Sequence, residues 1–228
     1  DRSRGRRAIA TLVHRVADAK CEFRGLHWYD GHLHGLDLAE RTAIAHRGYA
    51  ALGNLVARLA ALGVVPREII VAGTPAAPCA LSYPNWRDIG TDIQISPGTV
   101  VYNDTTSLEQ LPADWGLKPA ALVLTSIVSH PRPGRVTCDA GHKSVSADAG
   151  VPTCAVLGHA DWTPAKPSEE HLPIDCPDGS DVPAIGTPLL LLPRHICPTV
   201  NNFDEALLIR NGRVEGVTEV SARGHDGV

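Results

Sequence analysis

The first third of the chain alternates between amphipathic helical patterns and short runs of β-forming residues. Residues 7–19 carry apolar side chains at intervals of three and four, which predicts an amphipathic helix. A longer helical pattern covers residues 37–62 and stops before a glycine and a proline. Strand-like runs lie at residues 23–29 and 68–72. This alternation of helix and strand predicts parallel βα units.

Beyond about residue 112 the pattern changes to short strand-like runs that are separated by turns rich in glycine and proline. No helical pattern of comparable strength appears there. We therefore predict a separate antiparallel β domain and expect two domains, 1–115 and 116–228. The strands expected in the second domain are 121–128, 135–138, 153–157, 188–192, 206–209 and 217–222.

The first domain is too short for a closed barrel. It holds about three or four βα units, whereas a (β/α)8 barrel needs eight, over roughly 250 residues. The sequence therefore predicts either a small open sheet or one part of a barrel whose other part is absent from the chain.

Composition and charge exclude several classes of function. The 228 residues carry a net charge of −4, so we expect no basic stripe for nucleic acid. No apolar stretch approaches the roughly 20 residues of a membrane-spanning helix. The six cysteines are scattered without a C-x-x-C pair, which favours free thiols in a reducing cytosol over a disulfide framework. A cytoplasmic protein that binds neither nucleic acid nor membranes is expected.

His195 and Cys197 are candidate ligands of a metal ion. Side chains two positions apart point the same way from an extended segment, and zinc accepts both imidazole and thiolate. Chance gives about 0.3 such pairs for 11 histidines and 6 cysteines in 228 positions, so the spacing alone does not distinguish a metal site from coincidence. Two protein ligands would leave a zinc site open, which suits catalysis better than a structural role.

Two predicted strand ends carry candidate binding residues. Gly73 and Thr74 follow one strand, at the position where α/β enzymes bind phosphate through backbone N–H groups and a hydroxyl. Tyr29 and His32 end the preceding strand, where they could hydrogen-bond to a cofactor ring or a substrate carboxylate. Taken singly, these positions are explained better by an ordinary turn and by packing at a strand end.

Six short motifs follow one another along the chain: Trp28-Tyr-Asp-Gly-His32, Ala72-Gly-Thr-Pro75, Ser96-Pro-Gly-Thr-Val-Val-Tyr-Asn-Asp104, Asp139-Ala-Gly-His-Lys143, Ser168-Glu-Glu-His171 and Pro193-Arg-His-Ile-Cys-Pro-Thr199. In this order they resemble the D-serine dehydratase/D-threonine aldolase-like enzymes, the metal-assisted branch of the alanine-racemase fold class. The resemblance runs from about residue 23 to residue 225.

The resemblance implies a (β/α)8 barrel that carries pyridoxal phosphate, followed by an antiparallel β domain, in a homodimer whose two domains both shape the active site. This chain would then be the C-terminal part of the barrel together with the β domain. The implied site residues are Gly73 and Thr74 for the cofactor phosphate, Tyr29, His32 and Tyr102 for the cofactor pocket, and His195 and Cys197 for a divalent metal beside the substrate hydroxyl.

The lysine that forms the Schiff base in this family is missing from the chain. In the family it lies early in the barrel, inside an H-x-K-x-H-K type stretch. The four lysines here, Lys20, Lys118, Lys143 and Lys166, lie in no such stretch. The catalytic residue is therefore unknown, and we expect activity from the complete protein and not from this chain alone.

The resemblance implies a lyase that acts on a D-β-hydroxy amino acid. Imidazole and thiolate together suit zinc, so we expect a dehydratase for D-serine or D-3-hydroxyaspartate that releases water and ammonia. The alternative is an aldolase for D-threonine or another D-3-hydroxy amino acid. By resemblance, such aldolases carry a carboxylate in place of Cys197, which suits manganese or magnesium. A third hypothesis is a non-catalytic remnant, or a half that pairs with another chain.

Overall fold

The computed structural model describes residues 2–177 and 181–224 and divides the chain into two compact units. The first unit comprises Asp1–Gly98 and Gln110–Trp115, and the second comprises Thr99–Glu109 and Gly116–Val228. The predicted domains, 1–115 and 116–228, stay a prediction.

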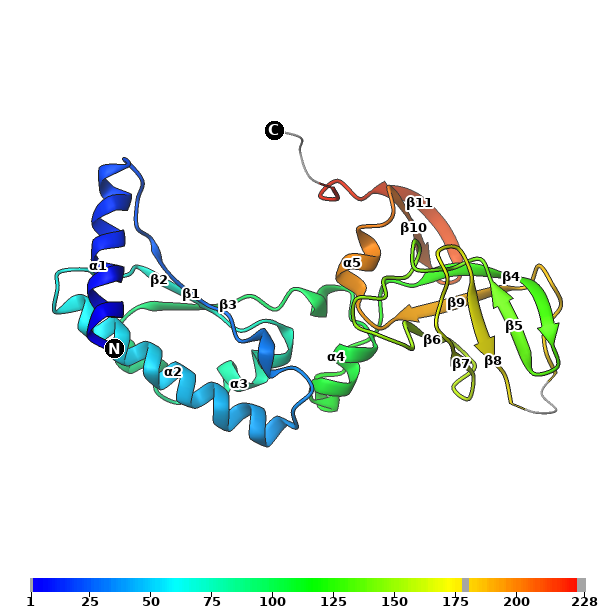
Figure 1. Ribbon diagram of the computed structural model, residues 1–228, viewed down its shortest axis with the longest axis horizontal. Coiled ribbons are helices and arrows are strands. Elements are labelled where there is room, and N and C mark those ends of the chain that lie inside the picture. Colours follow the sequence, from blue (N-terminus) through cyan, green and yellow to red (C-terminus); the bar gives the residue numbers. More distant parts are fainter. Residues whose placement is uncertain (1, 178–180, 225–228) are drawn as a thin grey trace. The chain divides into compact units, whose positions relative to one another are not determined.

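The first unit is built on a parallel sheet of three short strands in the order β1, β2, β3 (Figure 1). These strands are β1 (Gly25–Trp28), β2 (Glu68–Val71) and β3 (Asp92–Ile95), and they pair without a shift in register. Ile69 and Val71 of the central strand are fully buried, as expected inside a parallel sheet. Among the described residues, the outer edges of β1 and β3 pair with no further strand.

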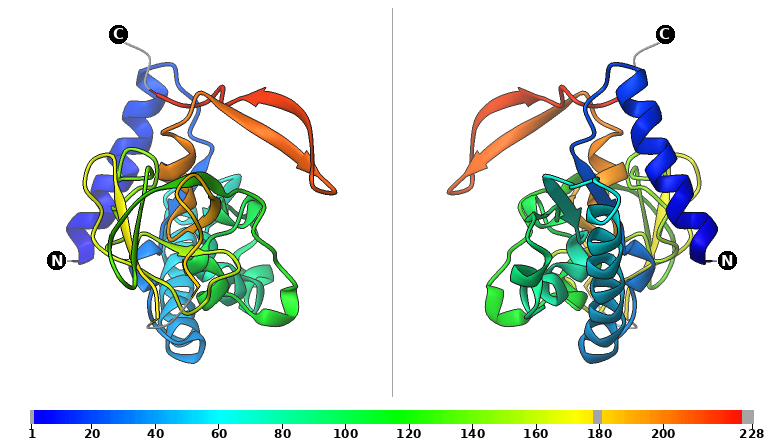
Figure 2. Two further views of the ribbon diagram at one scale, coloured as in Figure 1. Left: turned by 90° about the vertical axis from the view of Figure 1, so that its right-hand side faces the viewer. Right: turned by 90° about the vertical axis from the view of Figure 1, so that its left-hand side faces the viewer.

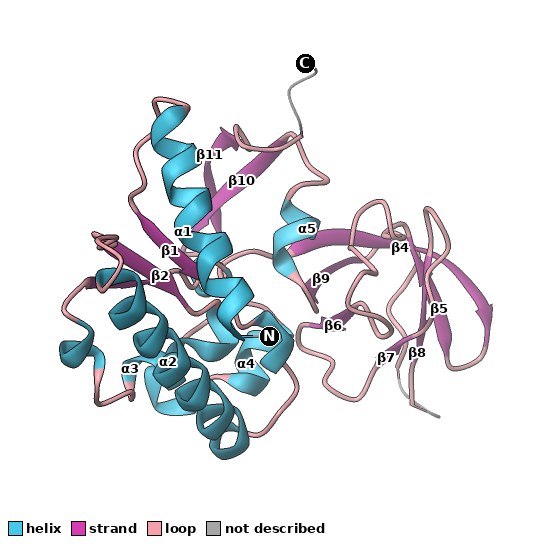
Figure 3. Ribbon diagram, turned by 60° about the vertical axis from the view of Figure 1, so that its left-hand side comes forward, coloured by secondary structure: helices cyan, strands magenta, loops and turns pink. Residues whose placement is uncertain are grey.

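Helix α2 (Leu38–Ala60) supplies much of the core of the first unit and lies alongside the sheet (Figure 3). It begins at Asp37, whose side chain accepts a hydrogen bond from the backbone N–H of Glu40. Its buried residues follow helical spacing and include Ala45, Tyr49, Leu52, Val56 and Leu59.

The first unit confirms the two predicted helices and the two predicted strands, with ends that differ by a few residues. The helix expected at residues 7–19 is α1 (Arg2–Asp18). The sequence pattern did not predict β3 or the short helical segments η1 (Gly31–Leu33), η2 (Thr74–Ala76), α3 (Ala77–Leu81), η3 (Trp86–Ile89) and η5 (Ala113–Trp115).

The second unit contains a six-stranded antiparallel sheet in the order β6, β9, β4, β5, β8, β7. The end strands β6 and β7 lie close together, so the sheet forms a nearly closed barrel around a hydrophobic core. The strands are β4 (Val123–Arg132), β5 (Arg135–Cys138), β6 (Cys154–Val156), β7 (Thr163–Pro164), β8 (Leu172–Asp175) and β9 (Pro188–Pro193). Short helical segments of this part of the chain are η4 (Thr99–Val101), α4 (Thr105–Gln110) and α5 (Ile196–Val200).

Strands β10 (Glu205–Arg210) and β11 (Arg213–Glu219) form an antiparallel hairpin in the second unit (Figure 2). A shift in register between Leu208 and Ile209 marks a bulge. The predicted antiparallel character of this half of the chain is thus confirmed for the barrel and for the hairpin.

Over residues 2–177 and 181–224, none of the helices combines the length and the apolar character that a membrane span requires. All six cysteines are free. The cytoplasmic location stays a prediction.

Candidate functional site: a metal ligand pair and a cofactor cradle

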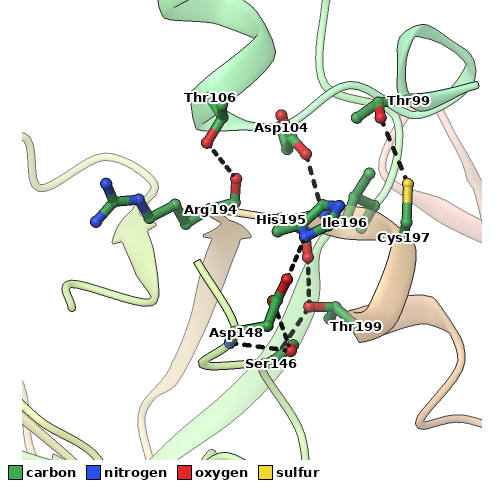
Figure 4. Close-up of polar contacts among 10 residues, drawn as sticks. All are labelled: Thr99, Asp104, Thr106, Ser146, Asp148, Arg194, His195, Ile196, Cys197 and Thr199. Atoms are coloured by element: carbon green, nitrogen blue, oxygen red, sulfur yellow. Dashed lines mark hydrogen bonds and ion pairs between the residues drawn. The ribbon is translucent and has the colours of Figure 1, made fainter. Parts of the chain in front are cut away.

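His195 and Cys197 lie where β9 leads into α5, in the second unit (Figure 4). The backbone of His195 is extended, with φ −134° and ψ 107°, and caps the helix, so Cys197 belongs to the first helical turn. The prediction that both residues share one extended segment was wrong, because the chain becomes helical at Ile196. Their side chains nevertheless lie close enough for each to shift the pKa of the other.

This contact changes the proton affinity of both side chains. The interaction with the side chain of Cys197 is the main reason why the pKa of His195 is raised to about 9, and the carboxylate of Asp148 adds to the rise against the effect of partial burial. The same interaction lowers the pKa of Cys197, with a smaller contribution from the hydroxyl of Thr99. Zinc binds neutral imidazole and thiolate, so zinc binding would release the proton from His195.

Three further side chains hold the segment that carries this pair. The Oδ2 atom of Asp148 lies 2.6 Å from Nδ1 of His195. Oγ1 of Thr99 lies 3.4 Å from Sγ of Cys197. Asp104, which is 1 % exposed, accepts a hydrogen bond of 3.0 Å from the backbone N–H of Ile196.

The donor set of this pair fits zinc. Within the described part of the chain, no cluster of three or more His, Cys, Asp or Glu side chains could hold a metal ion. His195 and Cys197 would therefore supply two protein ligands, and water or substrate would complete the coordination. Such an open site suits catalysis better than a structural role, which needs four protein ligands.

Three of the residues predicted to bind the cofactor meet in the first unit, at the carboxyl ends of β1 and β2. Gly73 immediately precedes η2, and Thr74 is 4 % exposed. A Cβ atom added at Gly73 would lie 3.4 Å from the ring of Tyr29, and one added at Gly31 would overlap that ring. Tyr29 is itself 70 % exposed, so its ring covers the two glycines on one side and faces solvent on the other.

The other two residues of the predicted cofactor pocket are His32 and Tyr102. His32 is exposed on η1, three residues after Tyr29 in the first unit. Tyr102 lies in the second unit and is 46 % exposed. The cofactor roles of all five residues stay predictions.

Sequence reasoning missed three aspartates at these sites. Asp30 is 2 % exposed beside Tyr29, accepts a hydrogen bond from the hydroxyl of Tyr49, and has its other carboxyl oxygen unpaired among the described residues. Asp30 and Asp104 stand inside two of the six short motifs, so their position was a usable signal. Asp148 stands in none of them.

None of the four lysines lies on the parallel strands β1, β2 or β3. Lys143 is engaged by Glu169 and Glu170, and these ion pairs raise its pKa. Its loop is also hydrogen-bonded through the backbone to the loop at residues 168–171. The motifs at residues 139–143 and 168–171 are therefore bonded to each other and are not separate solvated loops.

Comparison with known sequences places these sites in context. A family model described as "Putative serine dehydratase domain" matches residues 120–209. A D-threonine aldolase from Arthrobacter sp. is 28 % identical over 204 residues, which cover 89 % of this chain and 52 % of that protein. A 3-hydroxy-D-aspartate aldolase from Paracoccus denitrificans (strain Pd 1222) is 32 % identical over 209 residues, which cover 89 % and 51 %. The chain thus spans about half the length of these curated relatives.

Solved structures that resemble this chain come from the same kinds of enzyme. The D-threonine aldolase from Filomicrobium marinum superimposes with a TM-score of 0.82 and 27 % identity, over 94 % of this chain and 57 % of that one. The D-threo-3-hydroxyaspartate dehydratase from Delftia sp. HT23 gives a TM-score of 0.73 and 23 % identity, over 96 % and 60 %. At 23 % identity the second likeness shows the fold alone.

Proposed function

Because the chain belongs to the D-serine dehydratase/D-threonine aldolase family and has an alanine racemase-like fold, we propose that the complete protein is a lyase for D-3-hydroxy amino acids. Members of the family use pyridoxal phosphate and metal ions. We propose that this chain forms the C-terminal part of a (β/α)8 barrel and the β domain that follows, within a homodimer. The observation that carries the proposal is the convergence of His195 and Cys197 at the β9–α5 junction.

The comparisons favour the aldolase alternative over the dehydratase that the thiolate predicts. The aldolases share 27 % to 32 % identity with the chain, whereas the dehydratase likeness is confined to the fold. We therefore propose cleavage of the Cα–Cβ bond, which yields glycine and an aldehyde. Dehydration is the second candidate, because Cys197 stands where, by resemblance, aldolases carry a carboxylate.

The first unit supplies residues that fit the cofactor's phosphate. Without a side chain at Gly73, the backbone can approach an anion closely, and the hydroxyl of Thr74 can donate a hydrogen bond beside it. Tyr29 and His32 follow the end of the neighbouring strand and would line the cofactor pocket. Tyr102 is proposed for the cofactor pocket on the family resemblance alone. The lysine that anchors the cofactor is proposed to come from outside these 228 residues.

The second unit supplies the residues that would hold the metal. When bound, the pyridoxal ring withdraws electrons from the substrate's Cα, and the metal polarises the β-hydroxyl. His195 presents an imidazole nitrogen and Cys197 presents a thiol with a lowered pKa, so both groups can reach their metal-binding forms together. Thr99 orients the sulfur atom, and Asp104 fixes the backbone between the two ligands.

Product analysis of the complete protein tests this function. The protein is treated with a chelator, reloaded with zinc or manganese, and incubated with D-threonine. We expect glycine and acetaldehyde from the metal-loaded protein. Formation of a 2-oxo acid and ammonia would instead establish dehydration.

Two variants test the metal site itself. We expect His195→Ala and Cys197→Ala each to abolish metal-dependent turnover while the protein keeps its cofactor absorbance. Full activity after exhaustive chelation would rule out the metal role, and an inactive complete protein that still folds and binds cofactor would favour the non-catalytic hypothesis.

A further inference from the structure

A closed ring of hydrogen bonds surrounds His195 in the second unit (Figure 4). Nδ1 of His195 lies 2.6 Å from Oδ2 of Asp148, whose Oδ1 accepts a hydrogen bond of 2.8 Å from the hydroxyl of Ser146. The backbone N–H of Ser146 donates to Oγ1 of Thr199 at 3.2 Å, and this hydroxyl donates to the carbonyl of His195 at 2.8 Å. The ring therefore holds both the side chain and the main chain of the histidine.

The contact with Asp148 selects one tautomer of the imidazole. A carboxylate only accepts hydrogen bonds, so Nδ1 of His195 carries the proton in this contact. In the neutral ring, Nε2 is then the nitrogen whose lone pair remains available to a metal ion. The ring of hydrogen bonds thus directs Nε2 of the neutral imidazole, and not Nδ1, to a metal ion.

Asp148 is placed to orient a ligand and not to act as one. One of its oxygens is engaged with the imidazole and the other with Ser146. Within the described residues, moreover, it does not join His195 and Cys197 in a metal-binding cluster of three. Carboxylates that accept the second N–H of a ligating histidine occupy this place in metal sites.

The side chain of Asp104 holds the backbone of the same segment. It is almost fully buried, and its two oxygens accept hydrogen bonds from the backbone N–H groups of Ile196 and Ser107. Ile196 separates the two predicted ligands, so Asp104 fixes the main chain while Asp148 fixes the ring. This division leaves the orientation of the imidazole to Asp148.

We propose that Asp148 is a positioning residue of the metal site, which holds His195 so that Nε2 and the sulfur of Cys197 bind one divalent cation. The inference rests on the metal role proposed above for His195 and Cys197. Loss of such an orienting partner typically weakens metal binding by about 10- to 100-fold. As a plain ion pair the contact would matter little, because the side chains of His195 and Asp148 are 37 % and 46 % exposed.

Zinc affinity of the complete protein tests the proposal. Dissociation constants are measured by competition with a chromogenic chelator for the wild type, Asp148→Ala, Asp148→Asn and Ser146→Ala. We expect Asp148→Ala to bind zinc about 10- to 100-fold more weakly. Asp148→Asn should lose less, because its amide oxygen can still accept from Nδ1–H, and Ser146→Ala should also lose less, because the carboxylate itself remains.

Two controls separate positioning from folding. Asp161→Asn removes another exposed carboxylate of the second unit, one whose charge acts on Cys176, and should leave zinc affinity unchanged. Thermal unfolding of the metal-free Asp148 variants should match that of the wild type. With cobalt in place of zinc, the thiolate-to-cobalt absorption band should persist in Asp148→Ala at saturating metal, because Cys197 is intact.

The outcomes distinguish this inference from the proposed function. If His195→Ala and Cys197→Ala leave zinc affinity unchanged, the metal site itself is refuted. If those variants lose zinc but Asp148→Ala binds it like the wild type, only the positioning role is overturned. If Asp148→Ala does not fold, the test depends on Asp148→Asn and Ser146→Ala. Wild-type zinc affinity in both of these variants overturns the positioning role.

Discussion

Replacing Tyr49 by phenylalanine removes the donor to a buried carboxylate. The hydroxyl of Tyr49 donates a hydrogen bond of 2.7 Å to Oδ2 of Asp30, and the two residues are 0 % and 2 % exposed. Burial and the contact with Asp30 raise the pKa of Tyr49, so the phenol stays protonated and keeps donating. Oδ1 of Asp30 has no partner in the described part of the chain, so the substitution would leave both carboxyl oxygens without a protein donor there.

The expected loss of stability follows from the type of hydrogen bond that Tyr49 makes with Asp30. Hydrogen bonds to charged groups contribute about 1.5–3 kcal/mol, and the aromatic packing of Tyr49 against Tyr83 and Trp86 would be kept. We therefore expect Tyr49→Phe to lower the free energy of unfolding by about 2 kcal/mol. With a denaturant slope of about 2 kcal/mol per molar urea, the midpoint should fall by about 1 M.

Urea unfolding of the complete protein, followed by tryptophan fluorescence, measures this change. Trp86 is a suitable reporter because its ring centroid lies 4.8 Å from that of Tyr49. Tyr83→Phe is the matched control, since it removes a hydroxyl from the same aromatic cluster that makes no hydrogen bond among the described residues. The reasoning is refuted if Tyr49→Phe shifts the midpoint no more than Tyr83→Phe, or if its cost persists in an Asp30→Ala background.

Three further predictions concern the second unit. Cys197→Asp should shift metal preference from zinc towards manganese, as measured by affinity for each ion, and unchanged preference would contradict the ligand role. Gly141→Ala would place a Cβ atom against the backbone of the loop at residues 168–171, so we expect a lower midpoint of thermal unfolding, by several degrees. The backbone N–H of Ser126 is the main cause of the lowered pKa of Asp139. The ionised carboxylate of Asp139 should therefore stabilise the fold above its unfolded pKa of about 3.9. This stabilisation should be lost as pH falls through the lower pKa that Asp139 has in the folded protein. Asp139→Asn should flatten this part of the stability curve measured by acid titration.

The strongly patterned elements of the first unit were predictable, and the weakly patterned ones were not. The long apolar stripe of α2 and the aliphatic run of β2 each indicate one structure. Strand β3 reads Asp-Ile-Gln-Ile, is largely exposed at the edge of the sheet, and gives no comparable signal. Helix α5 has five residues with a proline among them, too few for a helical period to show.

Some residues of the candidate site were likewise predictable from the sequence, and others were not. His195 and Cys197 could be named because they lie two positions apart in a motif, and Gly73 could be named because it follows a recognisable strand. Asp148 lies 47 residues from His195, and their contact depends on how the chain folds between them. Sequence motifs therefore indicate the candidate ligands, whereas the groups proposed to orient them become visible only in three dimensions.

The unpaired edges of the parallel sheet carry a consequence for handling the protein. The outer edges of β1 and β3 expose backbone N–H and C=O groups that no other described strand satisfies, and such edges readily accept a strand from another chain. We therefore expect the isolated chain to self-associate. If the proposed function holds, we also expect fragment complementation: a separately produced polypeptide that supplies the proposed further barrel strands and the anchoring lysine should give turnover when the two are mixed.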